Sequence, residues 1–506
     1  MSAGASARAA RPPAGGAEGI ERLEIGIPGF DVIAGGGLPA GRSTLIAGTA
    51  GSGKTLFGVQ FLVAGIELYG QGGVLVSFDE PAREIARNVR SLGWDLGAYE
   101  RAGRLAMVDV ALVAGEEMLE AGQFDFGGLL ARLERQIERV GATRVVFDSL
   151  TGIFPQFTDR NVVRRELHRV TSRLRELGVT TLMTAERAEE YGPVARYGVE
   201  EFVTDNVVIL RNPLNHERRR RTLEILKFRG AAHHKGEYPF SIDERGGITV
   251  IPLAETGLKM RALTDRTSIG KPDVDQMCGG GIFRDSIVLV SGATGTGKTM
   301  MATEFLAAGL RAGERGLLYS FEESRPQILR NAASWGVDFG DAEREGMLRI
   351  DSRYPERTGL EDLLVEMRHQ INDFRPVRLA IDSLSVLDRV SSGASFREFV
   401  IGLTSLIKEF ELVAMCTNTT GVGGGTQSPG LTQVSTITDT IILLRYVEIA
   451  SSVRRCLTIL KMRGSAHDKT IREYTIGGHG MELGGPIAAT SGILAGTPGA
   501  RSQVRR

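Results

Sequence analysis

Short apolar runs rich in β-branched residues alternate along the chain with segments of helical periodicity. In the first half, the apolar runs occupy residues 43–48, 73–78, 144–149 and 180–185, and the helical segments occupy residues 54–69, 82–92 and 163–177. This alternation predicts a mostly parallel sheet covered by helices on both faces. The stretch from 206 to 242 is instead typical of antiparallel hairpins that end the unit.

The same motifs occur a second time in the same order. The matched pairs are GGGLPAGRSTLIAGTAGSGKT at 35–55 with GGGIFRDSIVLVSGATGTGKT at 279–299, RVVFDSL at 144–150 with RLAIDSL at 378–384, and LEILKFRG at 223–230 with LTILKMRG at 457–464. Such repetition predicts two homologous domains, which we place at 20–252 and 253–476. We expect a disordered N-terminal tail over 1–19 and a flexible C-terminal tail over 477–506, because both are rich in Gly, Ala and Pro.

The spacing of the matched motifs differs at one place. Asp79 and Glu322 lie 243 residues apart, whereas Asp148 and Asp382 lie 234 residues apart. The first copy therefore holds an insertion of about nine residues, which we place around 110–124. Two interpretations stay open for it, a docking loop or an idle surface loop.

Charge and cysteine content narrow the classes of function. The 61 basic and 61 acidic residues cancel, so the whole molecule has no field that would attract nucleic acid or an anionic membrane. The three cysteines, Cys278, Cys416 and Cys456, form no CxxC pair and fit the reducing cytoplasm. No apolar run approaches the roughly 18 residues of a membrane span. We expect a cytoplasmic protein without nucleic-acid or membrane partners.

Each repeat contains a complete Walker A sequence between an apolar strand and a helix. Glycines let backbone N–H groups wrap around phosphates, the lysine reaches the β- and γ-phosphates, and the threonine hydroxyl binds Mg²⁺. The expected ATP-binding residues are Gly48, Thr49, Gly51, Ser52, Gly53, Lys54 and Thr55 in the first copy, and Gly292, Thr294, Gly295, Thr296, Gly297, Lys298 and Thr299 in the second. The fold class is therefore α/β, with two tandem RecA-like P-loop NTPase domains that use ATP and Mg²⁺.

Carboxylates recur at the ends of two further predicted strands. Asp148 and Asp382 follow apolar strands in the Walker B position, where we expect them to join Thr55 and Thr299 at Mg²⁺. The acidic pairs Asp79–Glu80 and Glu322–Glu323 end the strand that follows each P-loop. Ligands of open α/β sheets bind at the carboxyl ends of the strands, so these acids can orient or deprotonate an attacking water or hydroxyl. We also assign Glu322 to the Mg²⁺ site.

Each repeat has one KxR motif, at the end of a strand late in the repeat. Lys227 and Arg229, and likewise Lys461 and Arg463, are two residues apart and share one face of a strand. They follow their own P-loops by more than 160 residues. Two interpretations stay open, a surface stripe or cations that act on a neighbouring subunit's ATP, and the second would require a ring.

These residues resemble the KaiC family, the double-domain ATPases of the circadian clock, from about Ile20 to Ile476. The most specific strings are ARYGVEEFVTDNVVILRN at 195–212, CGGGIF at 278–283 and ITDTIILLRYVEI at 437–449. The resemblance implies a homohexamer of two stacked rings with ATP at the subunit interfaces. It also implies an N-terminal ring that hydrolyses ATP and binds KaiB, and a C-terminal ring that is an autokinase and autophosphatase.

The resemblance assigns roles to further residues. Ser435 and Thr436 match the phosphorylated pair, Glu322 matches the base that activates the accepting hydroxyl, and Arg389 matches a cation of the kinase ring that acts in trans. The implied nucleotide contacts are Ser91, Lys227, Phe228, Arg229 and His233 in the first site, and Trp335, Arg455, Lys461, Met462, Arg463, Ser465, His467 and Lys469 in the second.

Three positions depart from the family pattern. Asp79 stands where the first domain of the family has glutamate, and Glu80 could compensate for its shorter side chain. Gly430 stands in place of a threonine thought to help shuttle phosphate, so the order and reversibility of phosphorylation are no longer implied. The tail from 477 keeps little of the KaiA-binding segment, and we predict that KaiA control is absent.

Two other functions compete with a clock component. A RecA- or RadA-type DNA-dependent ATPase would share the P-loop, but the neutral charge and the absence of an aromatic-plus-basic loop oppose it. A non-clock, ATP-driven signalling scaffold would keep the same rings. Ser435 and Thr436 do not separate that scaffold from a clock protein, because both could use a phosphorylated pair.

Overall fold

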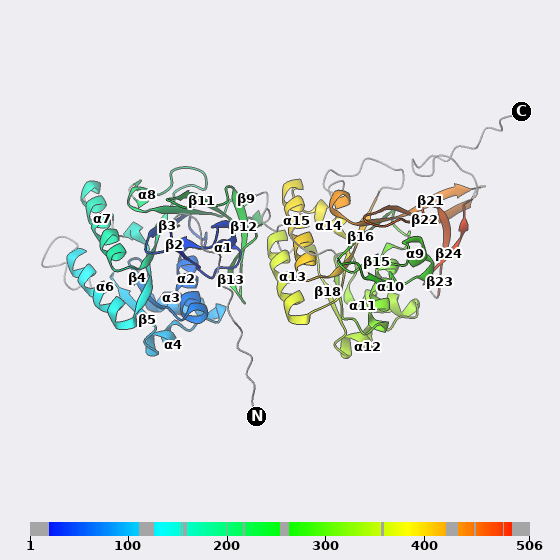
Figure 1. Ribbon diagram of the computed structural model, residues 1–506, viewed down its shortest axis with the longest axis horizontal. Helices are drawn as coiled ribbons and strands as arrows, with labels where there is room; N and C mark the ends of the chain where they lie inside the picture. The colour runs from blue at the N-terminus through cyan, green and yellow to red at the C-terminus, as the bar shows by residue number, and fades with distance from the viewer. Residues whose placement is uncertain are drawn as a thin grey trace, which may run out of the picture. The chain divides into compact units, whose positions relative to one another are not determined.

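The chain folds into two compact units, Met1–Val250 and Ile251–Arg506, each with its own nine-stranded sheet (Figure 1). The computed structural model describes residues 20–110, 126–152, 154, 159–198, 200–215, 218–252, 263–355, 359–420, 434–449, 452–478 and 480–487. The first unit also contains the antiparallel pair β9 and β10, and each unit begins with a short two-stranded sheet.

In the first unit the strand order is β13-β12-β11-β8-β3-β7-β6-β4-β5. Strands β8 to β5 along this order are parallel, and β11, β12 and β13 continue the sheet in antiparallel fashion. The strands are β3 Ser43–Gly48, β4 Gly72–Ser77, β5 Leu105–Asp109, β6 Ala142–Asp148, β7 Thr180–Glu186, β8 Asn206–Arg211, β11 Thr222–Phe228, β12 Glu237–Asp243 and β13 Gly247–Val250.

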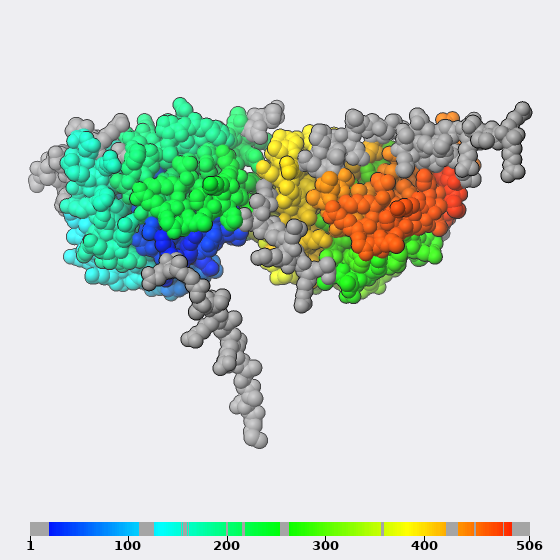
Figure 2. Space-filling model, turned by 45° about the horizontal axis from the view of Figure 1, so that its top comes forward, coloured from blue at the N-terminus to red at the C-terminus, as the bar shows by residue number. Residues whose placement is uncertain are grey.

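The second unit repeats this order strand for strand, as β24-β23-β22-β21-β16-β20-β19-β17-β18. Its strands are β16 Ile287–Gly292, β17 Gly316–Ser320, β18 Leu348–Ser352, β19 Arg378–Asp382, β20 Val413–Thr419, β21 Thr440–Ile449, β22 Ser452–Met462, β23 Arg472–Gly477 and β24 Gly480–Pro486. The predicted fold class, two tandem RecA-like domains with antiparallel hairpins at their ends, is confirmed. Figure 2 shows the antiparallel strands of each unit, green in the first and orange in the second, at the surface of that unit.

Helices cover both faces of each sheet, and each face has its own apolar cluster. The larger helices are α2 Lys54–Tyr69, α3 Ala82–Asn88, α6 Phe126–Val140 and α7 Arg160–Glu176 in the first unit, and α10 Lys298–Arg311, α11 Arg325–Ser334, α13 Leu360–Phe374 and α15 Gly393–Glu409 in the second. Across the part of the chain that the structure describes, no helix combines the length and apolar character needed to cross a bilayer.

Shorter elements complete the two units. They are α1 Phe30–Ile33, α4 Leu96–Arg101, α8 Glu200–Val203, α9 Pro272–Met277, α12 Phe339–Arg344 and α14 Leu384–Arg389, with the strand pairs β1 Arg22–Leu23 and β2 Leu38–Pro39, β9 Leu214–Asn215 and β10 Arg218–Arg219, and β14 Arg266–Thr267 and β15 Ile282–Phe283.

Two predicted helix boundaries differ from the structure, and one predicted insertion is not described by it. The helix expected at 82–92 ends at Asn88 and continues as one 3₁₀ turn, Val89–Leu92. The helix expected from 163 starts at Arg160, because the Asp159 carboxylate caps it by accepting a hydrogen bond from the amide of Asn161. The insertion placed at 110–124 lies, apart from residue 110, outside the described residues.

The prediction of a flexible tail from 477 is wrong for the strand β24. Met481 is buried, and its amide donates a 3.0 Å hydrogen bond to Glu304 on α10. Glu304 also pairs with Lys271 at 2.8 Å. A carboxylate on the P-loop helix therefore holds the glycine-rich strand in place, which local composition does not show.

In each unit a buried arginine donates hydrogen bonds both to the P-loop helix and to the segment at the start of that unit. Arg378 donates to the carbonyls of Ser268 and Phe305 and to Glu314, and Arg144 makes the equivalent set of bonds in the first unit. A buried guanidinium is tolerated only when its donors are satisfied. Each arginine packs on a helix glycine: a Cβ at Gly309 would lie 2.3 Å from Arg378 Cδ.

We predict that Gly309→Ala destabilises the second unit by about 1–3 kcal/mol, because the methyl group would displace a guanidinium fixed by several hydrogen bonds. Urea or thermal unfolding measures the change. Gly393→Ala is the matched control, since Gly393 also lies in a helix and a Cβ there meets no atom within 4 Å. Equal stability of the two variants would contradict the packing role of Arg378.

Candidate functional site

Both P-loops connect the central strand of a sheet to the N-terminus of a helix, β3 to α2 and β16 to α10. Gly51 and Gly53 have φ angles of 73° and 98°, and Gly295 and Gly297 have φ angles of 79° and 93°. Residues with a Cβ are strained in this left-handed region. The glycines therefore shape a loop whose amides turn toward a common centre, which fits phosphate groups.

The P-loop lysines fold over their own loops. Lys54 Nζ donates to the carbonyl of Thr49 at 2.9 Å, and Lys298 Nζ donates to the carbonyl of Ala293 at 3.0 Å. Burial lowers the pKa of both lysines, and neighbouring carboxylates, Asp148 among them, oppose the shift. Each lysine is thus partly desolvated, and the negative charge of bound phosphates would offset the cost of that desolvation.

Oxygen ligands for a divalent cation lie beside each lysine. The hydroxyl of Thr55 donates to Asp148 at 2.8 Å, and the hydroxyl of Thr299 donates to Asp382 at 2.7 Å. Burial raises the pKa of both aspartates, and hydrogen bonds from threonines oppose the shift. A bound cation would favour their charged form. Hydroxyl and carboxylate oxygens are the donors that Mg²⁺ prefers, so these residues fit the expected metal.

The first acid of each pair points to the serine that follows the Walker B aspartate. Asp79 accepts from Ser149 Oγ at 2.8 Å, and Glu322 accepts from Ser383 Oγ at 2.9 Å. Arg389 of the same chain lies 3.8 Å from Glu322. The structure therefore places Asp79 and Glu322 at the carboxyl ends of the parallel strands, on the same side of the sheet as the P-loop.

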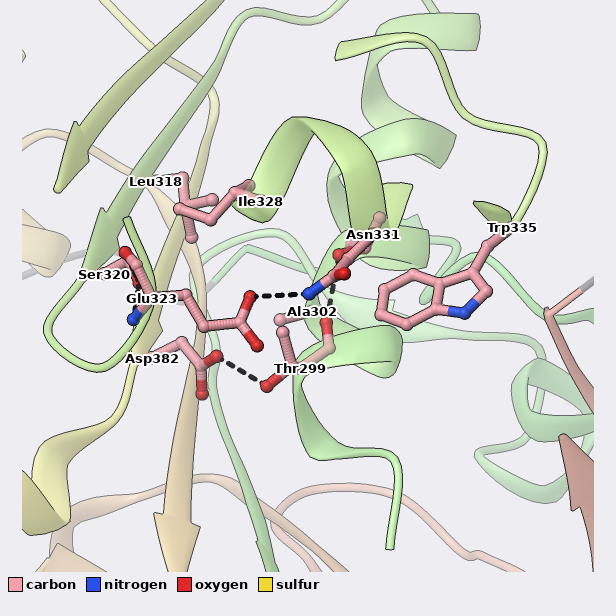
Figure 3. A pocket seen from close by; sticks show the side chains of 10 residues that line it. Thr299, Ala302, Leu318, Ser320, Glu323, Ile328, Asn331, Trp335 and Asp382 are labelled. Atoms are coloured by element: carbon pink, nitrogen blue, oxygen red, sulfur yellow. Dashed lines mark hydrogen bonds between the residues drawn. The ribbon is translucent and has the colours of Figure 1, made fainter. Parts of the chain in front are cut away.

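The second acid of each pair bonds to an asparagine of the following helix. Glu80 accepts from Asn88 at 2.8 Å, and Glu323 accepts from Asn331 at 3.1 Å. Figure 3 shows Glu323 and Asn331 facing each other in a pocket that Thr299, Asp382 and Trp335 also line. Burial raises the pKa of Glu323. The two acids of a pair therefore differ in their partners, a serine for the first and an asparagine for the second.

The lysines of the KxR motifs bond within their own units. A β-bulge at Leu226 and another at Leu460 precede them. Lys227 Nζ donates to the carbonyls of Glu201 and Thr204 at 2.9 and 2.7 Å. Lys461 does the same to the carbonyls of Ser435 and Thr438 at 2.9 and 2.7 Å. Both lysines therefore anchor a helical turn rather than project freely, while Arg229 and Arg463 stay more than half exposed.

The turn at 434–437 carries the expected phosphorylation pair. Lys461 bonds to the carbonyl of Ser435, and Arg463 bonds to the carbonyl of Thr436. The KxR motif thus bonds to the backbone of both residues expected to accept phosphate. In the first unit the equivalent turn, α8, holds Glu201 and Phe202, which cannot accept phosphate.

One of the other residues implied by the resemblance, Arg455, has a hydrogen bond to a P-loop. Arg455 donates to the carbonyl of Gly295 at 3.3 Å, and Ser465 accepts from Arg266 at 2.6 Å. The remaining positions are these: Ser91 donates to the carbonyl of Asn88, His233 packs edge-on against Phe228, His467 Nε2 is buried, Lys469 accepts through its carbonyl from Thr458, and Met462 is buried. Gly430 lies outside the described residues.

The sequence interpretation missed residues that support the acids. Ser149 and Ser383 recur in the repeated DSL motif, and Asn88 and Asn331 lie 243 residues apart like the acids they contact. Comparing the two copies position by position would have found them. Glu190 contacts Thr49 in the first P-loop but has no acidic counterpart in the second copy, so a comparison of the two copies does not reveal it.

The sheet order and the two P-loops define a tandem P-loop ATPase of the RecA type. The family model "ATPase: KaiC" matches residues 23–255 and 267–486. The chain is 53% identical over 491 residues to the circadian clock protein KaiC3 of Synechocystis sp., covering 97% of each chain. It is 51% identical over 480 residues to the circadian clock oscillator protein KaiC of Thermosynechococcus vestitus, covering 95% of this chain and 92% of that one. The chain belongs to the KaiC family, whose members are ATPases and serine/threonine autokinases.

We predict that Lys461→Met loosens the turn at 434–437, because two carbonyls lose their cationic donor. Hydrogen exchange followed by mass spectrometry should show faster exchange in peptides that contain Ser435–Thr438. Lys227→Met is the matched control and should affect only the turn at α8. Unchanged exchange near Ser435 would contradict the anchoring role of Lys461.

Proposed function

We propose that this protein is a KaiC-type timer or signalling component, in which the first unit hydrolyses ATP and the second phosphorylates and dephosphorylates Ser435 and Thr436. The observation that carries the proposal is the second site, where Glu322 is held by Ser383 beside the Thr299–Asp382 pair. A carboxylate held beside the P-loop can remove a proton from the attacking nucleophile.

In the first unit the attacking nucleophile is water. Lys54 and the amides of the P-loop hold the β- and γ-phosphates, and Asp79 orients the water and accepts its proton. Mg²⁺ held by Thr55 and Asp148 would neutralise charge on the triphosphate. Ser149 supports this step by fixing one oxygen of Asp79. ADP and inorganic phosphate leave.

In the second unit the nucleophile is a hydroxyl of Ser435 or Thr436 from a neighbouring copy. Its oxygen bonds to the γ-phosphorus while the bond to the ADP oxygen breaks, and Glu322 takes the hydroxyl proton. Arg389, 3.8 Å from Glu322, places positive charge near the transferring group. Thr299 and Asp382 would hold Mg²⁺ here. In the autophosphatase reaction water takes the phosphoryl group from Ser435 or Thr436, which releases inorganic phosphate and restores the hydroxyl.

The assembly that fits this chemistry is a homohexamer with ATP between subunits, since the acceptor of one copy must reach the site of the next. We assign a KaiB-like partner to the N-terminal ring, no KaiA control because of the altered tail, and a cytoplasmic location. Arg463 and Arg229, which are largely exposed, are the cations that can reach a neighbouring nucleotide. Gly430 removes one hydroxyl near the acceptor pair, which would alter the order of phosphorylation.

Incubation with Mg-ATP, followed by intact-mass spectrometry and peptide mapping, tests the proposal. We expect phosphate on Ser435 and Thr436, and a loss of at least about 100-fold in its rate of incorporation for Glu322→Gln. Glu323→Gln is the matched comparison and should lose less than about tenfold, because Glu323 is directed to Asn331. A chain that hydrolyses ATP without gaining phosphate would reduce the proposal to an ATPase.

A further inference from the structure

In the first unit a carboxylate lies against the P-loop. Glu190 accepts from the hydroxyl of Thr49 at 2.7 Å and from the amide of Asn212 at 2.9 Å. The side chain of Asn212 in turn donates to the carbonyl of Gly51 at 3.4 Å. Thr49 and Gly51 belong to the loop whose amides face the phosphates, so the negative charge of Glu190 is adjacent to the nucleotide site.

The loop that carries Glu190 is held rigidly by two buried arginines. Arg187 donates to the carbonyls of Pro193 and Gly192 at 3.0 and 2.8 Å. Arg211 donates to the carbonyl of Glu190 at 3.3 Å and pairs with Glu224. Both arginines are less than a tenth exposed. Glu190 therefore keeps a fixed place at the loop and does not sample solvent like a surface glutamate.

The second unit lacks the residues that hold Glu190. Ala293 replaces Thr49, and Tyr446 replaces Asn212. The sequence after β20, GVGGG at 421–425, contains no acid. The carbonyl of Gly295 accepts instead from Arg455 at 3.3 Å, and the first unit has Arg221 at the position of Arg455. The two units therefore share the arginine and differ in the acid.

We propose that Glu190 sets the nucleotide affinity of the first site, by placing a fixed negative charge beside the phosphates that weakens binding and speeds the release of ADP. The inference rests on the proposed function, in which the first P-loop binds ATP. Like charges several ångströms apart at a partly buried site repel enough to change affinity by roughly three- to tenfold. Product release limits many ATPases, so the charge tunes turnover without touching the reacting atoms.

The test uses the full-length chain with Lys298→Ala, which silences the second site, and a fluorescent ADP analogue as the probe. We expect Glu190→Gln to slow release of the analogue roughly three- to tenfold and to lower its dissociation constant by a similar factor. Glu189→Gln is the matched control, because Glu189 is exposed and carries the same charge one residue away. It should leave the release rate unchanged.

A second variant separates charge from the hydrogen bond. Glu190→Asp keeps the negative charge but shortens the side chain that accepts from Thr49, and release should not become slower. The inference is overturned if Glu190→Gln releases the analogue at the parent rate or faster, or if Glu189→Gln or Glu190→Asp slows release as much. A parent chain that binds no ADP analogue overturns the proposed function of the first site together with this inference.

Discussion

A hydrogen bond between a threonine of the P-loop and an aspartate two strands away defines the geometry of each site. The hydrogen bonds from Thr55 to Asp148 and from Thr299 to Asp382 are shorter than 3 Å, because parallel strands bring their carboxyl ends to the same side of the sheet. The register places Ser77 opposite Asp148 and Ser320 opposite Asp382. Asp79 and Glu322 lie two residues beyond those serines, just after their strands end, so their positions depend on the same register.

The two units share this strand register and differ from each other at a few residues beside it. We relate those differences to the different reactions proposed for the two sites. In the first unit a Cβ at Gly152 would lie 2.0 Å from Asp79, so the short acid and the glycine fit together, whereas Val386 takes the place of Gly152 beside the longer Glu322. The turn held by the KxR lysine carries Glu201 in one unit and Ser435 in the other. In the proposed scheme, one methylene in the acid and one hydroxyl in the anchored turn distinguish the hydrolytic site from the phosphoryl-transfer site.

Much of this organisation could be predicted from the sequence, because each motif occurs in both copies and the second occurrence supports the interpretation of the first. The helix at 54–69 and both Walker pairs follow directly from spacing and periodicity. The anchoring of Lys227 and Lys461 could not be predicted, since it depends on a bulge that changes which way the strand presents its residues. Strand β24 was also missed, because its stability comes from Glu304, about 180 residues earlier in the chain, and not from its own glycine-rich composition.

Two sites that perform separate reactions should respond differently to Asp79→Asn. With γ-labelled ATP, released inorganic phosphate and protein-bound label are measured on the same sample. We expect phosphate release to fall about tenfold or more, while label on the peptide that contains Ser435 and Thr436 is retained. If protein-bound label instead falls in proportion to phosphate release, the two sites do not act separately.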